Sequence, residues 1–235
     1  MNHVIEVQNL VVTYRDEPVI HNISFTFEKG KLVGIVGPNG AGKSTMIKAI
    51  LNLIPSDHGS VSFYGKPLNE VRRQIAYIPQ RFDIDLHFPI NVLDTVTLGT
   101  YPKLGLFKRV GKYEKIQALN ALKRVGMQNY AYTQISELSG GQQQRVFLAR
   151  VLVQDADILF LDEPFVGVDV ASELAMMNIL AQLKSEGKTI FVVHHNLEKV
   201  KEYFDDLIIL NKEIIDLGPT ESVFNDEVLA RAYGD

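Results

Sequence analysis

The sequence predicts an α/β fold with a mainly parallel sheet, an antiparallel β part at the N-terminus and an inserted helical part. Three observations support this prediction. Residues 3–28 alternate apolar and polar side chains, which is typical of antiparallel strands with one wet face. After residue 150, short apolar runs alternate with amphipathic segments, as in a doubly wound parallel sheet. Residues 82–150 lack a strand pattern, which indicates helices.

The N-terminal part is expected to consist mainly of strands. Alternating or clustered β-branched and aromatic residues place them at "VIEVQNLVVTY", "ISFTFEKG", "KLVGIVG", "GSVSFYGKPL" and "QIAYIPQ". The string "KLVGIVG" is apolar without alternation, so this strand is expected to be buried on both faces. A helix follows in "KSTMIKAILNLI", where Met46, Ile47 and Ile50 recur at helical spacing. Pro55 and Gly59 end it.

The clearest helix of the inserted part is "EKIQALNALKRVGM", which Gly126 ends. The apolar residues expected on its one buried face are Ile116, Leu119, Leu122 and Val125. Beyond the insertion, strands and helices alternate through "DILFLDE", "SELAMMNILAQLKSEG", "KTIFVVHH", "NLEKVKEYF", "DLIIL" and "EIIDL". We therefore expect a single domain over 1–235, in which 1–81 and 151–235 form the α/β core and 82–150 form a helical subdomain.

Composition and charge exclude several classes of protein. The 235 residues are 46% hydrophobic and 22% charged, which is ordinary for a globular protein. Broad nucleic-acid binding needs clustered Lys and Arg, so a net charge of −4 argues against a nucleic-acid partner. Without cysteine, disulfides and thiolate chemistry are excluded. Apolar runs such as "ILFL" are far shorter than the ~20 residues of a membrane-spanning helix, and no apolar signal core opens the chain.

The string "GPNGAGKST" matches the phosphate-loop pattern G-x-x-x-x-G-K-[ST]. Its glycines let the backbone curl so that N–H groups face phosphates, while Lys43 reaches the β- and γ-phosphates and Ser44 can ligate Mg²⁺. A Gly-rich turn that matches by chance is the alternative, which the preceding strand and following helix disfavour. The residues expected to bind nucleotide here are Gly37, Pro38, Asn39, Gly40, Ala41, Gly42, Lys43, Ser44 and Thr45.

A second string, "DILFLDEP", supplies acidic residues for phosphoryl transfer. Its apolar strand delivers Asp162 to the carboxyl edge of the sheet, where ligands bind in open α/β folds. Asp162 can hold the metal through water or Ser44, and Glu163 can orient the attacking water and accept its proton. Acids that only cap a strand end are the alternative, which the phosphate loop in the same chain disfavours. Together the two strings predict a P-loop NTPase core that hydrolyses the γ-phosphate of a nucleoside triphosphate.

A second anion site is expected in "SELSGGQQQRVFLAR", residues 136–150. Its Ser-Gly-Gly lies at the expected start of a helix, where free N–H groups and the helix dipole favour negative charge. With "LSGGQ" followed by "ILFLDEP", the chain resembles the ATP-binding-cassette ATPases over essentially its whole length. The resemblance implies ATP and Mg²⁺ as cofactors. It also implies that two copies pair head to tail, so that each second anion site serves the ATP bound to the opposite copy. The residues of this site are Ser139, Gly140, Gly141 and Gln142.

The resemblance also implies roles for single residues. Tyr14 would stack on adenine, and Gln80 would sense the γ-phosphate and Mg²⁺. Asp169 would lie in the loop that crosses the dimer interface, and His195 would contact the γ-phosphate and help to position Glu163 and the attacking water. The metal-binding residues are then Ser44, Gln80 and Asp162. The catalytic residues are Glu163, His195 and Lys43.

Three positions depart from the family pattern. Val166 and Val168 stand where the interface loop often has Ser and Leu, and His194 stands where Thr or Ser is common. A zinc site formed by His194 and His195 is not expected, because consecutive strand residues point to opposite faces. No Cys or carboxylate lies at ligand spacing from them either.

The resemblance further implies partners in a membrane. A separate integral-membrane permease would hold this chain at the cytoplasmic face of the cell membrane, and an extracytoplasmic solute-binding protein would complete the complex. After Gln80, the apolar residues suited to the permease contact are Phe82, Ile84, Leu86 and Phe88. The basic stretch "YPKLGLFKRVGKYEK" could touch acidic headgroups, although a solvated loop and helix start is the favoured interpretation.

Transport is the favoured function among the classes that fit these motifs. Soluble cassette proteins acting on ribosomes or DNA usually carry two cassettes or a long coiled coil, and "LSGGQ" opposes a kinase or switch GTPase. The strings "DEPFVGVDV", "FVVHHNL" and "GLFKRVGK" resemble the ATP-binding subunits of bacterial manganese-, zinc- or iron-type importers. A manganese or zinc importer is therefore expected, and an ATPase for an iron chelate or an amino acid is the alternative.

Overall fold

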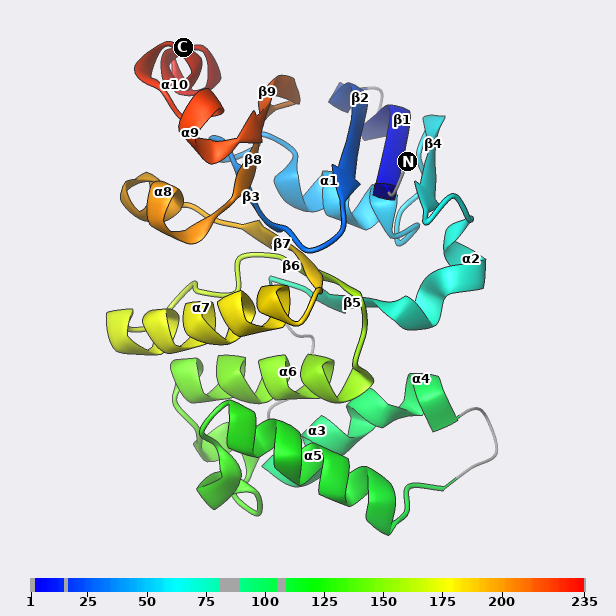
Figure 1. Ribbon diagram of the computed structural model, residues 1–235, viewed down its shortest axis with the longest axis vertical. Coiled ribbons are helices and arrows are strands. Elements are labelled where there is room, and N and C mark those ends of the chain that lie inside the picture. Colours follow the sequence, from blue (N-terminus) through cyan, green and yellow to red (C-terminus); the bar gives the residue numbers. More distant parts are fainter. Residues whose placement is uncertain (1–2, 15–16, 81–88, 105–108, 235) are drawn as a thin grey trace.

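A computed structural model describes residues 3–14, 17–80, 89–104 and 109–234 (Figure 1). Its strands are β1 His3–Tyr14, β2 Glu17–Glu28, β3 Leu32–Val36, β4 His58–Phe63, β5 Ile75–Ile78, β6 Ile158–Leu161, β7 Thr189–Val193, β8 Asp206–Asn211 and β9 Glu213–Pro219. Its α-helices are α1 Lys43–Ile50, α2 Leu68–Val71, α3 Val92–Thr97, α4 Tyr101–Leu104, α5 Lys112–Arg124, α6 Gly140–Gln154, α7 Val170–Ser185, α8 Val200–Tyr203, α9 Thr220–Val223 and α10 Asp226–Tyr233. Short 3₁₀ turns are η1 Arg72–Gln74, η2 Leu98–Thr100, η3 Gln128–Tyr130, η4 Ile135–Glu137 and η5 Leu197–Lys199.

The strands form two sheets among the described residues. A sheet of order β2-β1-β4 is antiparallel throughout. The larger sheet has the order β5-β6-β7-β3-β8-β9, with parallel pairing from β5 to β8 and an antiparallel β9 at its edge. The predicted fold class is confirmed by this mainly parallel sheet and by the antiparallel sheet at the N-terminus.

The larger sheet is buried on both faces, which explains why its strands are apolar without alternation. In β3, Leu32 and Val36 pack in one core with α6 and α7. Val33 and Ile35 point to the other side and pack in a second core with α1 and the antiparallel sheet. Figure 1 shows α7 and α6 on one side of the sheet and α1 with β1 and β2 on the other.

Between β5 and β6 the described residues form the helices α3 to α6, at the lower end of the view in Figure 1. The buried face predicted for α5 is wrong at its start, because Ile116 is 54% exposed. Ala118, Ala121 and Leu122 form the buried face and pack against α3 and α6. A spacing of three residues falls about 60° short of a full turn at each step, so Ile116 and Val125 lie on opposite sides of the helix.

The fold brings the ends of four strands to one edge. The phosphate loop follows β3, Gln80 follows β5, Asp162 follows β6 and His195 lies just after β7. This is the carboxyl edge of the parallel strands, where open α/β sheets bind their ligands.

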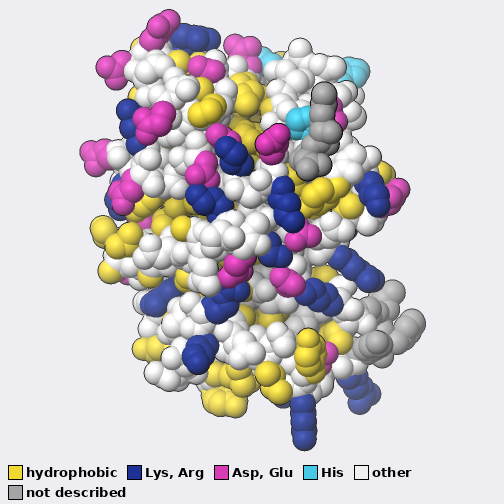
Figure 2. Space-filling view, in the orientation of Figure 1, with side chains coloured by type: hydrophobic (Ala, Val, Ile, Leu, Met, Phe, Trp, Pro, Cys, Tyr) yellow, Lys and Arg dark blue, Asp and Glu magenta, His cyan; other side chains and the backbone are white. Residues whose placement is uncertain are grey.

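Two further properties of the surface bear on partners. No helix among the described residues is long and apolar enough to cross a membrane. On the face in Figure 2, Lys and Arg side chains are interspersed with Asp and Glu, so charge alone does not mark a binding surface there. The apolar segment 82–88 expected to contact a permease, and part of the basic stretch at 105–108, lie outside the described residues.

Candidate active site

The phosphate loop curls tightly between β3 and α1. Gly37 has φ 156°, and a Cβ atom there would approach the carbonyl oxygen of Leu210 to 1.9 Å. Gly42 has φ 92°, and a Cβ atom there would lie 2.6 Å from Cδ1 of Ile20. Glycine is therefore required at both positions, by backbone conformation and by space. Across the loop, the amide of Lys212 donates to the carbonyl of Ala41 at 2.9 Å, which ties the loop to the turn after β8.

Lys43 is buried in the loop, with 6% of its surface exposed. Its ammonium group donates to the carbonyl oxygens of Gly37 at 2.8 Å and Pro38 at 2.9 Å. Burial lowers the pKa of Lys43, whereas the charges of Glu163 and Asp162 act in the opposite direction. The cation is thus held inside the loop by neutral carbonyls, and phosphate oxygens are stronger partners for it than carbonyls.

Asp162 is 1% exposed at the end of β6. Its Oδ1 accepts a hydrogen bond from the Ser44 hydroxyl at 2.8 Å, and its Oδ2 accepts one from the Tyr77 hydroxyl at 3.4 Å. Burial raises the pKa of Asp162, although the Ser44 hydrogen bond opposes the shift. Burial, followed by the charge of Asp162, also raises the pKa of Tyr77. A buried carboxylate beside a hydroxyl fits Mg²⁺, which prefers oxygen ligands.

Protein ligands alone do not make a metal cage here. Among the described residues, no group of three or more His, Cys, Asp or Glu side chains is placed to hold a metal ion.

Glu163 joins three of the predicted residues. Its Oε2 accepts a hydrogen bond from Nε2 of Gln80 at 2.5 Å, and its Oε1 lies 2.6 Å from Nε2 of His195. Glu163 itself adopts φ 53°, a left-handed conformation that costs a non-glycine residue about 1–3 kcal/mol. The strained backbone aims the carboxylate between β5 and β7, so that an amide and an imidazole hold it from two sides.

Lys43, Ser44, Gln80 and Glu163 line a pocket of about 350 Å³ beside the phosphate loop. Tyr14, which is 46% exposed, stands at its rim. The residues that line it are Tyr14, Val19, Asn39, Gly40, Ala41, Gly42, Lys43, Ser44, Thr45, Gln80 and Glu163. Most of the residues predicted to bind nucleotide therefore meet in one place.

The second predicted anion site lies elsewhere. Ser139 caps α6: its hydroxyl accepts a hydrogen bond from the amide of Gln142 at 3.4 Å, and its own amide donates to Oε1 of Gln142 at 2.9 Å. Ser139 and Gly140 are exposed, whereas Gly141 is buried. None of these four residues lines the pocket at the phosphate loop of the same chain.

The segment 166–170 lies against the start of α6. A Cβ atom at Gly141 would come within 3.5 Å of Oδ2 of Asp169. Asp169 caps α7 by accepting a hydrogen bond from the amide of Ser172 at 3.0 Å, and hydrogen bonds from Ser172 lower its pKa. Val166 and Val170 are 58% and 69% exposed, so the surface beside α6 is apolar.

His194 points away from His195 and into the protein. It is 4% exposed and meets the rings of Phe165, Tyr203 and Phe204 at centroid distances of 5.6–5.8 Å. Burial lowers the pKa of His194. It is therefore a core histidine, and His195 is the one that contacts Glu163.

The family follows from comparison with known proteins. The family model described as ABC transporter matches residues 20–166 of this chain. The chain belongs to the ABC transporter family. It is an ATP-binding subunit with ATPase activity.

Relatives of this ABC ATPase match it along nearly its whole length. It is 54% identical over 230 residues to the manganese transport system ATP-binding protein MntB of Listeria monocytogenes, covering 98% of this chain and 96% of that protein. It is 49% identical over 232 residues to the zinc transport system ATP-binding protein TroB of Treponema pallidum, covering 99% and 87%. Among solved structures, a dimeric bacterial ABC transporter cassette, MJ0796, matches with a TM-score of 0.80 and 28% identity over 92% of this chain and 98% of that one.

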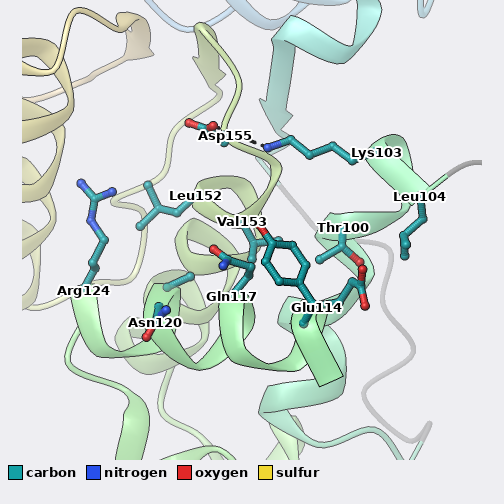
Figure 3. Close-up of a pocket in the computed structure, with 12 residues that line it drawn as sticks. Thr100, Lys103, Leu104, Glu114, Gln117, Asn120, Arg124, Leu152, Val153 and Asp155 are labelled. Atoms are coloured by element: carbon teal, nitrogen blue, oxygen red, sulfur yellow. Dashed lines mark ion pairs between the residues drawn. The ribbon is translucent and has the colours of Figure 1, made fainter. Parts of the chain in front are cut away.

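The ABC ATPase also has wider cavities away from the phosphate loop. One of about 600 Å³ lies between α4, α5 and the end of α6. Figure 3 shows Gln117 and Asn120 of α5 beside it and the ion pair of Lys103 with Asp155, 3.5 Å apart, at its border. It contains none of the predicted site residues, so size does not identify the active site of this protein.

Two contacts of the ABC ATPase site were missed by sequence reasoning. The resemblance implied that His195 helps to position Glu163, and the two side chains are in contact, but the hydrogen bond from Gln80 to Glu163 was not predicted. Tyr77 was not singled out, although it belongs to the short strand that leads to Gln80. The signal that could have found it is a hydroxyl-bearing aromatic in a strand that ends at the same edge as Asp162.

Proposed function

We propose that this ABC ATPase hydrolyses ATP to energise the passage of manganese or zinc through a separate permease. Similarity over nearly the whole chain to ATP-binding proteins of manganese and zinc transport systems is the observation that carries the choice of ion. The ion is cargo for the permease, so the residues of this chain need no site for it.

Mg²⁺ is proposed to bind with ATP at the phosphate loop. Ser44 and Asp162 are already joined at 2.8 Å, and Gln80 lines the same pocket. When bound, Mg²⁺ supplies positive charge to the β- and γ-phosphates. A cation would also offset the cost of keeping the Asp162 carboxylate ionised while 1% exposed.

In the proposed hydrolysis, Lys43, Glu163 and His195 have different roles. Lys43 exchanges its carbonyl partners for phosphate oxygens, and the amides at the start of α1 bind the same charge. Glu163 orients the attacking water and accepts its proton. His195 holds the Glu163 carboxylate from one side, 2.6 Å away, and in this proposal it also donates toward the γ-phosphate.

A second copy of this chain is proposed to complete each site. The amides at the start of α6 and the exposed Ser139 have no phosphate to bind at the loop of their own chain. A head-to-tail pair would place them on the ATP of the other copy, and the apolar Val166 and Val170 would be buried in that interface. A relative has been solved as a dimer, which supports this arrangement.

The membrane partners are also part of the proposal. An integral-membrane permease would recruit the chain to the cytoplasmic face of the cell membrane, and an extracytoplasmic solute-binding protein would deliver the ion. Support comes from the names of the relatives, which are ATP-binding proteins of transport systems.

The experiment that tests the chemistry is Glu163→Gln. The amide keeps the shape of the side chain but cannot accept the proton of the water, so we expect ATP hydrolysis to fall by at least about 100-fold. ATP affinity should be retained, and a dimer should accumulate with Mg-ATP in size-exclusion chromatography. Glu202→Gln, an exposed change on α8, is the matched control. Normal turnover by Glu163→Gln would remove Glu163 from the mechanism.

The ion and the partners are tested with the same variant. Tagged Glu163→Gln loaded with Mg-ATP should recover a multi-span permease from detergent-solubilised host cells. Cells carrying this variant in place of the natural chain should lose uptake of radiolabelled Mn²⁺ or Zn²⁺. Normal uptake of both ions would overturn the choice of cargo. Recovery of ribosomal or DNA-repair proteins without a membrane subunit would overturn transport itself.

A further inference from the structure

The carboxylate of Asp162 is held at both of its oxygens. Ser44 donates to Oδ1 at 2.8 Å, and Tyr77 donates to Oδ2 at 3.4 Å. The backbone is fixed as well, because the amide of Asp162 donates to the carbonyl of Ile78 at 2.9 Å. Rotation of the carboxylate about the Cβ–Cγ bond of Asp162 would break both side-chain hydrogen bonds at once.

The Tyr77 hydroxyl is well placed to keep this bond. Tyr77 pairs with Phe160 in the register of β5 and β6, two residues before Asp162. Its ring is half-buried against the core that contains α1, so the hydroxyl is anchored by the sheet and by packing. A phenol is protonated at neutral pH and can donate to a carboxylate.

The other predicted metal residues do not provide this restraint. Ser44 is itself expected to turn its oxygen toward Mg²⁺, and the amide of Gln80 is engaged with Glu163 at 2.5 Å. Among the described residues, Tyr77 is thus the side chain that binds Asp162 without having its own place in the metal shell.

We infer that Tyr77 is a positioning residue of the Mg²⁺ site, whose hydroxyl orients the Asp162 carboxylate toward the metal and its water. This inference rests on the Mg²⁺ site of the proposed function. Partners that orient metal-binding side chains contribute strongly to metal sites, and their loss typically costs 10–100-fold in affinity or activity. The long hydrogen bond of 3.4 Å places Tyr77 at the lower end of that range.

Tyr77→Phe isolates the hydroxyl. Tyr77 also lines a groove of about 240 Å³ with Pro79, Phe147 and Arg150, and phenylalanine would keep the backbone and the ring in place. The chain offers a matched control in Tyr64→Phe. The Tyr64 hydroxyl is buried and has no hydrogen-bond partner among the described residues, so its removal changes the same atom without touching Asp162.

The measurement is the Mg²⁺ concentration that half-saturates nucleotide binding, made in the Glu163→Gln background so that ATP stays intact. A fluorescent ATP analogue reports binding during the Mg²⁺ titration, and a parallel titration in EDTA gives affinity without metal. For Tyr77→Phe we expect the half-saturating Mg²⁺ to rise about tenfold. The affinity in EDTA and the nucleotide-free melting temperature should stay at the parent values.

Three other results of the Mg²⁺ titration would overturn the inference, and each has a different meaning. Equal Mg²⁺ requirements for Tyr77→Phe, Tyr64→Phe and the parent would show that the hydroxyl does not position Asp162. An equal loss of affinity with and without Mg²⁺ would show a role in the fold or the pocket instead. A parent whose ATP binding ignores Mg²⁺ would overturn the metal site of the proposed function, and the role of Tyr77 with it.

Discussion

Two helix starts in this protein, those of α1 and α6, offer the same local chemistry to an anion but have very different surroundings. The start of α1 is enclosed by the buried Lys43, by Ser44 bonded to Asp162 and by a pocket of about 350 Å³. At the start of α6, Ser139 and Gly140 are exposed, and the Ser139 hydroxyl is occupied by the amide of Gln142 in its own helix.

The difference shows what a helix N-terminus can and cannot do alone. Free amides and the helix dipole favour an anion at either end. Only at α1 does the chain add a cation, a metal-binding carboxylate and a candidate base from neighbouring strands. Under the proposed function the start of α6 is half of a site, and a phosphate bound to a second copy would supply the other half.

The largest effect should come from removing the cation at α1. Lys43→Ala is expected to weaken ATP binding by at least about 100-fold, roughly 3 kcal/mol, because a buried ammonium is a strong phosphate partner. The nucleotide-free protein should not lose stability, since burial already disfavours the charge of Lys43. Isothermal titration and thermal melting measure the two quantities. Lys115→Ala, on the exposed part of the helical region, serves as control, and retained micromolar affinity for Lys43→Ala would contradict the phosphate-loop assignment.

An intermediate effect is expected at the start of α6. It should appear in the rate of hydrolysis and in dimer formation, not in ATP binding by the single chain. Ser139→Ala should leave ATP binding to the single chain unchanged, because this residue does not line the α1 pocket. Hydrolysis by concentrated protein should fall about 10–100-fold, as when a donor to the transition state is lost. The ATP-dependent dimer of Glu163→Gln should also be lost when both changes are combined.

The control for Ser139→Ala separates this effect from helix capping. Loss of an N-cap side chain costs about 1 kcal/mol of stability. Asn91→Ala removes the N-cap of α3, where the side chain accepts from the amide of Asp94 at 2.8 Å, and should cost about as much without slowing hydrolysis. If Ser139→Ala weakened ATP binding by the single chain, the contrast between the two helix starts would not hold.

The two regions also differ in how well the sequence predicts them. At α1 the requirements are local: a tight curl, a cation and a hydroxyl lie within nine consecutive residues, and each has a recognisable residue type. The predicted strands and helices likewise follow from short-range patterns. Where a pattern was applied too loosely, as for Ile116 in α5, a spacing of three residues drifted around the helix and the predicted face was wrong.

The resemblance implied the proximity of His195 and Glu163, but the hydrogen bonds from Gln80 to Glu163 and from Tyr77 to Asp162 were not predicted, because they depend on strand order. Gln80 and His195 both contact Glu163 because β5, β6 and β7 are neighbours in the sheet. That order is a tertiary property, because β5 and β6 are separated by the whole helical region. The Tyr77 hydrogen bond arises from the same pairing. The site roles inferred by resemblance, including those of Tyr14, Asp169 and the α6 residues, stay predictions until the variants are measured.

The smallest expected effect depends on pH. It concerns the segment from Glu163, which lines the α1 pocket, to Asp169, which lies against the start of α6. Phe165, between Glu163 and Asp169, packs edge to face on His194 at 5.7 Å. Burial lowers the pKa of His194; Glu173 acts to raise it, and His195 and Lys199 act to lower it further. The folded protein therefore keeps His194 neutral at pH values where the unfolded chain begins to protonate it. The contribution of His194 to the free energy of unfolding is therefore fully present above the ordinary histidine pKa of about 6.5, and it is lost as the pH falls below that value.

His194→Thr tests this support of the segment from Glu163 to Asp169. The variant should melt lower than the natural protein at pH 8, because it leaves a cavity among Tyr203, Phe204 and Phe165. The difference in melting temperature between the two proteins should narrow at pH 5.5, because only the natural protein has to keep this buried imidazole neutral while its unfolded chain is protonated. His58→Thr, an exposed histidine on β4, should leave the pH dependence unchanged. A difference in melting temperature that stays constant with pH would mean that His194 stabilises this segment only by filling space. Its protonation state would then have no effect on stability.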